Sequence, residues 1–143
     1  MSREAALTAA ILRRSAWAPA TVLAAHVVLN ALQLYQRFPD LDIPMHFVGG
    51  LAVAHVTARA VDVGREAGVV RLGPVLLEKL LIIACTALAA VLWELHELVL
   101  DTLAGTRELG DLADTLGDLF FGLLGGTVYA ALRRGGNRAG GPE

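Results

Sequence analysis

Four long apolar segments, separated by shorter polar stretches, divide the chain. They cover residues 16–35, 45–61, 76–93 and 112–132. Each is close to the ~20 residues that a helix needs, at about 1.5 Å per residue, to cross ~30 Å of hydrocarbon. Because the interior of a bilayer offers no water to the backbone, a segment that crosses it has to be helical. The pattern therefore predicts an all-α integral membrane bundle of four transmembrane helices.

A soluble four-helix bundle is the alternative for segments of this length. Such a bundle needs a polar stripe along each helix, and residues 80–93 show none. Composition points the same way, because 55% of the 143 residues are hydrophobic and only 18% are charged. The mean hydropathy of +0.57 is high for a soluble domain of this size. The membrane bundle is therefore the favoured interpretation.

The segments divide the chain into three parts. Residues 1–15 are predicted to form a cytoplasmic or interfacial segment with a short amphipathic helix, and residues 16–132 form the transmembrane domain. Residues 133–143 read as a disordered cytoplasmic tail. Arg13 and Arg14 precede an apolar run, as in a secretory signal, but the run continues through Leu34 without a small-residue cleavage site. We therefore expect the first helix to be retained.

The basic residues set the predicted orientation. Three arginines precede the first segment, three follow the fourth, and four basic residues lie in or beside the connection between the second and third. The other two connections carry one arginine each, Arg37 and Arg107. Because cytoplasmic loops are enriched in Lys and Arg, both termini and the middle connection are predicted to be cytoplasmic. The sequence thus predicts a multi-pass protein of the cell membrane.

Acidic residues gather on the opposite, non-cytoplasmic side of this predicted topology. Nine of the 14 Asp and Glu residues fall there: Asp40, Asp42, Glu94, Glu97, Asp101, Glu108, Asp111, Asp114 and Asp118. Acidic residues are ordinary in non-cytoplasmic loops, because only Lys and Arg are restricted there. That explains Asp40 and Glu108, but it does not explain the carboxylates inside predicted helices.

Helical spacing places these carboxylates on shared faces. Three groups have spacings of three or four residues: Asp42 with His46, then Glu94 with Glu97 and Asp101, then Asp111 with Asp114 and Asp118. Asp118 lies about 10 Å along the helix axis from Asp111, where an ionised group needs a partner, a metal or a wet cavity. Facing carboxylate stripes repel each other. We therefore expect a divalent cation, protons, or Arg37 and Arg107 between them.

Carboxylates with an imidazole suit Mg, Mn, Ca or Zn, and we predict a divalent metal ion as the cofactor. The predicted ligands are Asp42, His46, Glu94, Glu97, Asp111, Asp114 and Asp118. The chain has no HExxH motif, and its single cysteine, Cys85, excludes a disulfide or a thiolate pair within one chain. His46 and Glu97 are the candidate catalytic residues for proton transfer. Arg37 and Arg107 are the candidate contacts to an anionic substrate.

Small residues form ridges on two of the predicted helices. They are Gly50, Ala54 and Ala58 on the second and Gly122 and Gly126 on the fourth. Such ridges let helix backbones approach closely in lipid, and the same faces would allow homo-oligomers. We predict that the second helix packs against the fourth. This packing would bring His46 beside Asp114 and Asp118.

Two stretches of the sequence resemble the VanZ-like membrane proteins and the related YjdF-like group. They are "DIPMHFVGG" and "ELHELVLDTLAGTRELGDLADTLGDLFFGLLGG", within residues 40–126. The VanZ-like pattern is matched by Asp42, His46, Phe47, Glu94 or Glu97, Arg107, Asp114 and a late glycine. The chain departs from it at Ile43, Glu97 and Asp118, where Lys, Gln and Asn are usual. The pairs Gly110-Asp111 and Asp114-Thr115 are more similar to the YjdF-like group.

The resemblance implies a multi-pass cell-envelope protein, and VanZ-like members are linked to glycopeptide tolerance. It implies no particular reaction. The first class of function is a binder or enzyme acting on a phosphate-bearing envelope lipid, with metal-dependent phosphoester chemistry in the enzyme case. The only serines, Ser2 and Ser15, lie near the N-terminus, so water activated by the metal would have to attack.

A small ion- or proton-coupled transporter is the second class, and non-catalytic binding of a headgroup or partner helix is the third. In each class of function, we expect membrane lipid either to surround the protein or to bind to it. The net charge of −2 gives no indication of a nucleic-acid partner.

Overall fold

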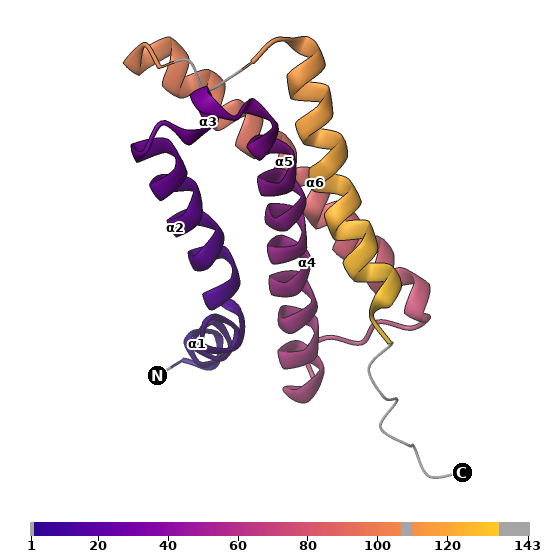
Figure 1. The fold of residues 1–143 in the computed structure, drawn as a ribbon. Helices are drawn as coiled ribbons and strands as arrows, with labels where there is room; N and C mark the ends of the chain where they lie inside the picture. The colour runs from indigo at the N-terminus through magenta and orange to yellow at the C-terminus, as the bar shows by residue number, and fades with distance from the viewer. Residues whose placement is uncertain (1, 107–109, 135–143) are drawn as a thin grey trace, which may run out of the picture.

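The computed structural model describes residues 2–106 and 110–134, and these form helices joined by short turns (Figure 1). In chain order they are α1 (Arg3–Ser15), α2 (Trp17–Ala31), α3 (Leu34–Arg37), a short 3-10 helix η1 (Pro39–Leu41), α4 (Asp42–Glu66), α5 (Val75–Ala104) and α6 (Leu112–Leu132). The described residues contain no β-strand. The all-α prediction is confirmed for this part of the chain.

Three of the helices are long and apolar enough to cross a membrane. They are α4 with the preceding 3-10 turn (Pro39–Glu66), α5 and α6. Two of them are longer than the apolar segments alone indicated. Pro44 is tolerated in the first turn of α4, where no helical N–H is lost, so Asp42 and His46 belong to that helix. The C-terminus of α5 is reached only at Gly105, which has a left-handed φ of 67°, so the acidic stripe on α5 is helical.

The first apolar segment does not form the continuous helix predicted over residues 16–35. α2 has 15 residues and ends at Ala31, which gives a length of about 22 Å. The break follows at Gln33, whose φ of 54° places the backbone in the left-handed region that interrupts a right-handed helix. The four-residue helix α3 then leads to the 3-10 turn. Four complete spans and their orientation therefore stay predictions.

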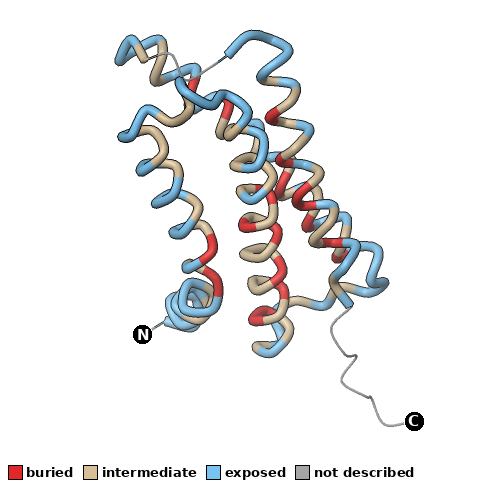
Figure 2. Tube along the Cα trace, viewed as in Figure 1, coloured by how far each residue is buried: buried red, intermediate tan, exposed pale blue. Residues whose placement is uncertain are grey.

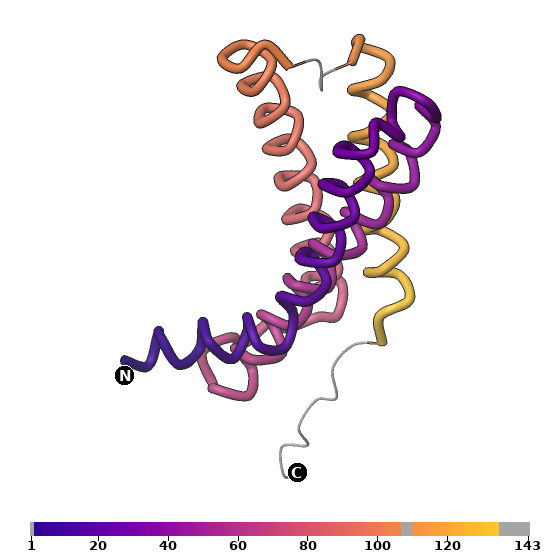
Figure 3. The backbone as a smooth tube through the Cα atoms, turned by 60° about the vertical axis from the view of Figure 1, so that its left-hand side comes forward, coloured from indigo at the N-terminus to yellow at the C-terminus, as the bar shows by residue number. Residues whose placement is uncertain are grey.

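The helices form a bundle in which α4, α5 and α6 pack together and α2 lies along α4 (Figures 1 and 3). α1 lies across one end of the bundle, and Figure 1 shows it end-on where α2 is seen from the side. Arg14 of α1 pairs with Glu66 at 2.7 Å, and Arg3 donates a hydrogen bond to the carbonyl of Ala67 at 2.8 Å, so α1 is docked on the end of α4. The α4–α5 connection lies at this same end, whereas α3 and the start of α6 lie at the other (Figure 1).

Backbone contact between α4 and α6 dominates the core, as the small-residue ridges predicted. A Cβ built on Gly50 would lie 1.9 Å from the carbonyl oxygen of Gly122, and one on Gly125 would lie 2.1 Å from that of Phe47. Any side chain at these positions would separate the two helices. The buried positions of the two helices face each other, and the outer surfaces are exposed (Figure 2). The close contact fixes the height of one helix relative to the other.

Candidate metal centre at the acidic end of the bundle

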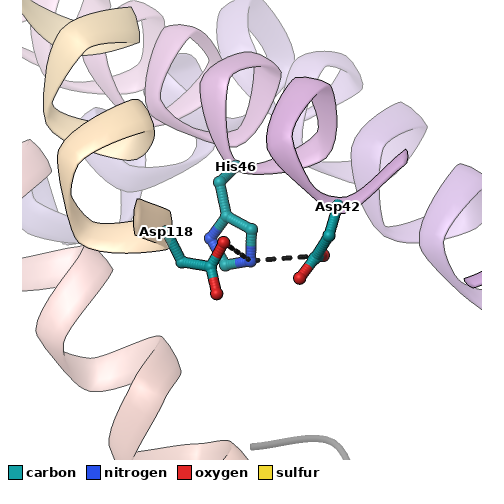
Figure 4. A group of neighbouring side chains, drawn as sticks. All are labelled: Asp42, His46 and Asp118. Carbon is teal, nitrogen blue, oxygen red and sulfur yellow. Dashed lines mark ion pairs between the residues drawn. The ribbon is translucent and has the colours of Figure 1, made fainter. Parts of the chain in front are cut away.

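The first turns of α4 and α6 place three ionisable side chains at the same end of the bundle. Asp42 and His46 are one turn apart on α4, and Asp118 comes from the second turn of α6. Gly50 lies one turn after His46, and Gly122 lies one turn after Asp118. Because these two glycines are in contact, the imidazole and the Asp118 carboxylate face each other. Figure 4 shows the two carboxylates on either side of the His46 ring. The predicted approach of His46 to Asp118 is confirmed.

The distances among these groups suit a single small ion. His46 Nε2 lies 3.4 Å from Asp42 Oδ1 and 3.6 Å from Asp118 Oδ1 (Figure 4). One ligand atom from each residue lies within 4.8 Å of the others. Two ligands bound at 2.0–2.6 Å to one ion are separated by at most about 5 Å. The side chains of His46 and Asp118 are 11% and 7% exposed, whereas that of Asp42 is 33% exposed, so the group is buried on one side and open to solvent at Asp42.

Two glutamates of α5 lie beside this group and are buried. Glu94 and Glu97 are each 8% exposed. Glu97 Oε1 accepts a hydrogen bond from the indole N–H of Trp93 at 2.7 Å. Both oxygens of Glu94 are buried and have no hydrogen-bond partner among the described residues, although the Thr115 hydroxyl is near enough to interact with the carboxylate. Burying a carboxylate is costly where few groups compensate its charge, so a cation near Glu94 would be favourable.

Positive charge is scarce around these carboxylates. Glu94, Glu97 and Asp118 all interact electrostatically with His46, and the other charged groups that act on them are acidic. His46 is thus the basic group that acts on all three carboxylates, and it is cationic only when its ring is protonated. One imidazolium neutralises a single charge, whereas Asp42 and these three residues offer four.

Two other predicted ligands lie outside this group. Asp111 caps the N-terminus of α6, where its Oδ1 accepts hydrogen bonds from the backbone N–H groups of Ala113 at 2.8 Å and Asp114 at 3.0 Å. Asp114 is exposed and lies in the first turn of α6, with its carboxylate over Gly110. It acts on Glu94 and Asp118 only electrostatically. The structure therefore brings Asp42, His46 and Asp118 together, with Glu94 and Glu97 beside them.

Of the two predicted substrate-binding arginines, the structure describes Arg37 alone, and Arg37 is not in this group. Arg37 is an exposed residue at the end of α3, where it lines a shallow hollow with Phe38 and Asp40. Arg107 lies outside the described residues. The predicted tail falls mostly at residues 135–143, which are also outside them.

A cavity of about 280 Å³ borders the candidate metal centre. Asp42 and His46 line its polar end, and the rest of its wall is mainly apolar and comes from α2, α4 and α5. The cavity therefore extends from the ionisable groups into the apolar part of the bundle.

The opposite end of the bundle holds a second ionic cluster, which the sequence patterns did not reveal. Glu78 of α5 is only 1% exposed and lies 2.6 Å from both Arg65 of α4 and Arg133, which follows α6. Arg133 also pairs with Asp62 of α4 at 2.6 Å. The sequence feature that could have indicated this cluster is Glu78, an acidic residue at the start of an apolar segment with arginines nearby in the sequence.

Arg133 lies just beyond the last turn of α6, and its pKa reports the balance of this cluster. Burial lowers the pKa of Arg133, but the hydrogen bonds that it donates to Asp62 and Glu78, together with their negative charges, outweigh burial and raise the pKa above its ordinary value. The guanidinium therefore stays charged and joins α4, α5 and the end of α6.

Long apolar helices with ionisable groups buried at both ends define a membrane protein with several candidate spans. The chain belongs to the family described as predicted membrane protein (DUF2238), whose family model matches residues 7–136. That match covers every helix from α2 to α6 and most of α1. No curated protein and no solved structure matches the chain.

Proposed function

We propose that the acidic end of the bundle binds a divalent cation through Asp42, His46 and Asp118, and through that ion the phosphate of a cell-envelope lipid. One observation carries the proposal. Three ligand atoms from two helices lie within 4.8 Å of one another, beside a buried carboxylate, Glu94, that has no hydrogen-bond partner among the described residues. A cation would offset the repulsion among these carboxylates and would provide a counter-charge for Glu94.

The ligand chemistry narrows the choice of ion. Imidazole suits zinc and other transition metals, and carboxylates suit harder ions such as Mn²⁺ and Mg²⁺. A mixed set of one imidazole and several carboxylates therefore favours Mn²⁺ or Zn²⁺ over Ca²⁺, which prefers oxygen ligands alone. Because the imidazole Nε2 is the ring atom that faces both carboxylates, it is the atom we assign as the ligand.

The phosphate ligand follows from charge and location. A cation held by a few protein ligands keeps open positions for an anion, and in a membrane protein the abundant anions at the interface are lipid headgroups. The resemblance of the Asp42–His46 stretch to the VanZ-like and YjdF-like proteins supports a role in the cell envelope. The distribution of arginines supports a non-cytoplasmic location for the acidic end.

A hydrolytic reaction at this site would need a proton acceptor. With Nε2 of His46 assigned to the ion, Glu97 is the better candidate, because it is buried beside the site and oriented by the Trp93 hydrogen bond. The ion would supply Lewis-acid activation of the phosphate. The alternative is a proton- or ion-coupled transporter, in which the same carboxylates and His46 would exchange protons.

Metal analysis of the purified protein tests the proposal. After incubation with Mn²⁺ or Zn²⁺ and removal of free ion, we expect about one ion per chain by elemental analysis. His46→Ala and Asp118→Asn should each reduce metal affinity at least tenfold. Asp40→Asn is the matched control, because Asp40 is an exposed carboxylate at the same end. If the wild type binds neither ion, and the substitutions change only proton-coupled uptake into vesicles, the transporter takes the place of this proposal.

A further inference from the structure

The cavity beside the candidate metal centre has the shape of a groove between α2, α4 and α5. Its lining residues recur at helical spacing, with Val22 and His26 on α2, Met45, Gly49 and Val53 on α4, and Ala89 on α5. α2 packs extensively on α4, but its described residues make no extensive contact with α5. The cavity lies between α2 and α5 and is lined by residues of both.

One bridge crosses this space near the acidic end. The rings of His26 and Trp93 meet edge to face with centroids 5.3 Å apart, and His26 also forms a hydrogen bond with the Tyr35 hydroxyl at 3.1 Å. Trp93 is the residue that donates to Glu97 in the candidate metal centre. The same aromatic group thus borders both the groove and the ionisable side chains, in the position where membrane proteins carry interfacial aromatics.

The length and width of the groove fit one hydrocarbon chain. From Asp42 to Val53 on α4 the lining runs about 16 Å along the helix axis, close to the ~15 Å of one leaflet of the hydrocarbon core. The cavity holds about 280 Å³. A single flexible hydrocarbon chain fits this volume.

We infer that this groove holds one hydrocarbon chain of the lipid whose phosphate is bound at the metal centre. This inference rests on the proposed function and names its ligand class as an anionic phospholipid. Asp42 and His46 line both the groove and the metal centre, so a molecule that fills both has a phosphate at the polar end and an apolar chain along α4. A free phosphate would occupy the metal centre alone, and a neutral hydrocarbon would occupy the groove alone.

Two variants fill the groove from different helices. Ala89→Leu adds bulk on α5, and Gly49→Leu adds it on α4, where a Cβ would meet no atom within 4 Å. Ala84→Leu is the matched control, because Ala84 is an exposed residue of α5 that does not line the groove. Manganese content is measured for every variant and reports whether the metal centre has been retained.

The probes are dipalmitoyl phosphatidate and glycerol 3-phosphate, measured with the Mn²⁺-loaded protein in detergent. We expect the wild type and Ala84→Leu to bind phosphatidate at least tenfold more tightly than glycerol 3-phosphate. Ala89→Leu and Gly49→Leu should lose that preference while retaining Mn²⁺ and the weak binding of glycerol 3-phosphate.

The outcomes separate the groove from the metal centre. Unchanged phosphatidate binding by both groove-filling variants, with Mn²⁺ retained, would overturn the groove and leave the metal centre standing. A wild type that binds neither Mn²⁺ nor Zn²⁺ would overturn the metal centre. In that case, phosphatidate binding that Ala89→Leu abolishes and Ala84→Leu preserves would still support the groove.

Discussion

The two ends of the bundle bury similar numbers of charged groups but balance them differently. At one end, Glu78 and Asp62 lie 2.6 Å from arginine nitrogens of Arg65 and Arg133. At the other end, Asp42, Glu94, Glu97 and Asp118 share only the His46 imidazole among the described residues. The charges at the first end are neutralised within the chain, and their ion pairs hold α4, α5 and the end of α6 together. The second lacks charge of one sign, which is the property expected of a binding site.

Removing the acid at the balanced end should have the largest effect on stability. Glu78→Gln removes the charge of a buried acid and leaves the partly buried Arg65 and Arg133 short of a partner, and breaking a buried pair costs about 3–5 kcal/mol. We expect a loss of this size in the free energy of unfolding, measured by thermal or denaturant unfolding in detergent. Glu66→Gln is the control, because its ion pair with Arg14 is exposed and should contribute little. Equal effects of the two substitutions would contradict the structural role of Glu78.

The same change at the acidic end should behave in the opposite way. Asp118→Asn removes one of several crowded carboxylates, so the metal-free protein should be at least as stable as the wild type. The wild type should gain about 2.7 kcal/mol when the ion is present at 100 times its Kd, and the variant, which should bind the ion at least tenfold more weakly, should lose about half of this gain or more. Thermal unfolding with and without Mn²⁺ measures both quantities.

A structural role for the Asp118 carboxylate would give another result. If the metal-free protein collapses on Asp118→Asn while Asp118→Leu folds normally, the interpretation of the acidic end as a crowded, cation-requiring site is wrong.

The smallest expected effect on stability comes from a test of sidedness. In a Cys85→Ala background, Asp40→Cys and Arg71→Cys place single thiols at exposed positions of the acidic and basic ends. With the acidic end outside, a membrane-impermeant thiol reagent applied to intact cells should label position 40 and leave position 71 unlabelled until the cells are opened. Labelling in the reverse pattern would place the acidic end in the cytoplasm and remove the proposed access to outer envelope lipids.

The sequence carried most of the information on the acidic end because its signals were periodic. The four-residue spacing of Asp42 and His46 and the glycines of α4 and α6 predict which faces meet, and the contact of Gly50 with Gly122 confirms that packing. Asp111 has the same spacing, yet its side chain caps α6. Spacing along one helix cannot separate a capping residue from a ligand, because both occupy the first turn.

The basic end was less accessible to sequence reasoning. The arginines at this end indicated the orientation of the chain but not their ion-pair partners. Arg133 and Glu78 are far apart in the sequence and meet only because the helices pack together. The break in the first apolar segment was also unpredictable from hydropathy. It depends on the left-handed backbone of Gln33, a residue that an ordinary helix would accept.

The short helix α2 has a consequence for the shape of the surrounding bilayer. At 15 residues it measures about 22 Å, whereas the 30 residues of α5 extend about 45 Å and run obliquely across the bundle (Figure 1). A bilayer with ~30 Å of hydrocarbon meets such mismatch by thinning beside a short helix, and a long helix tilts. If α2 spans the membrane, we therefore expect the boundary between water and hydrocarbon to be uneven around this protein and to dip toward the membrane centre on the side of α2.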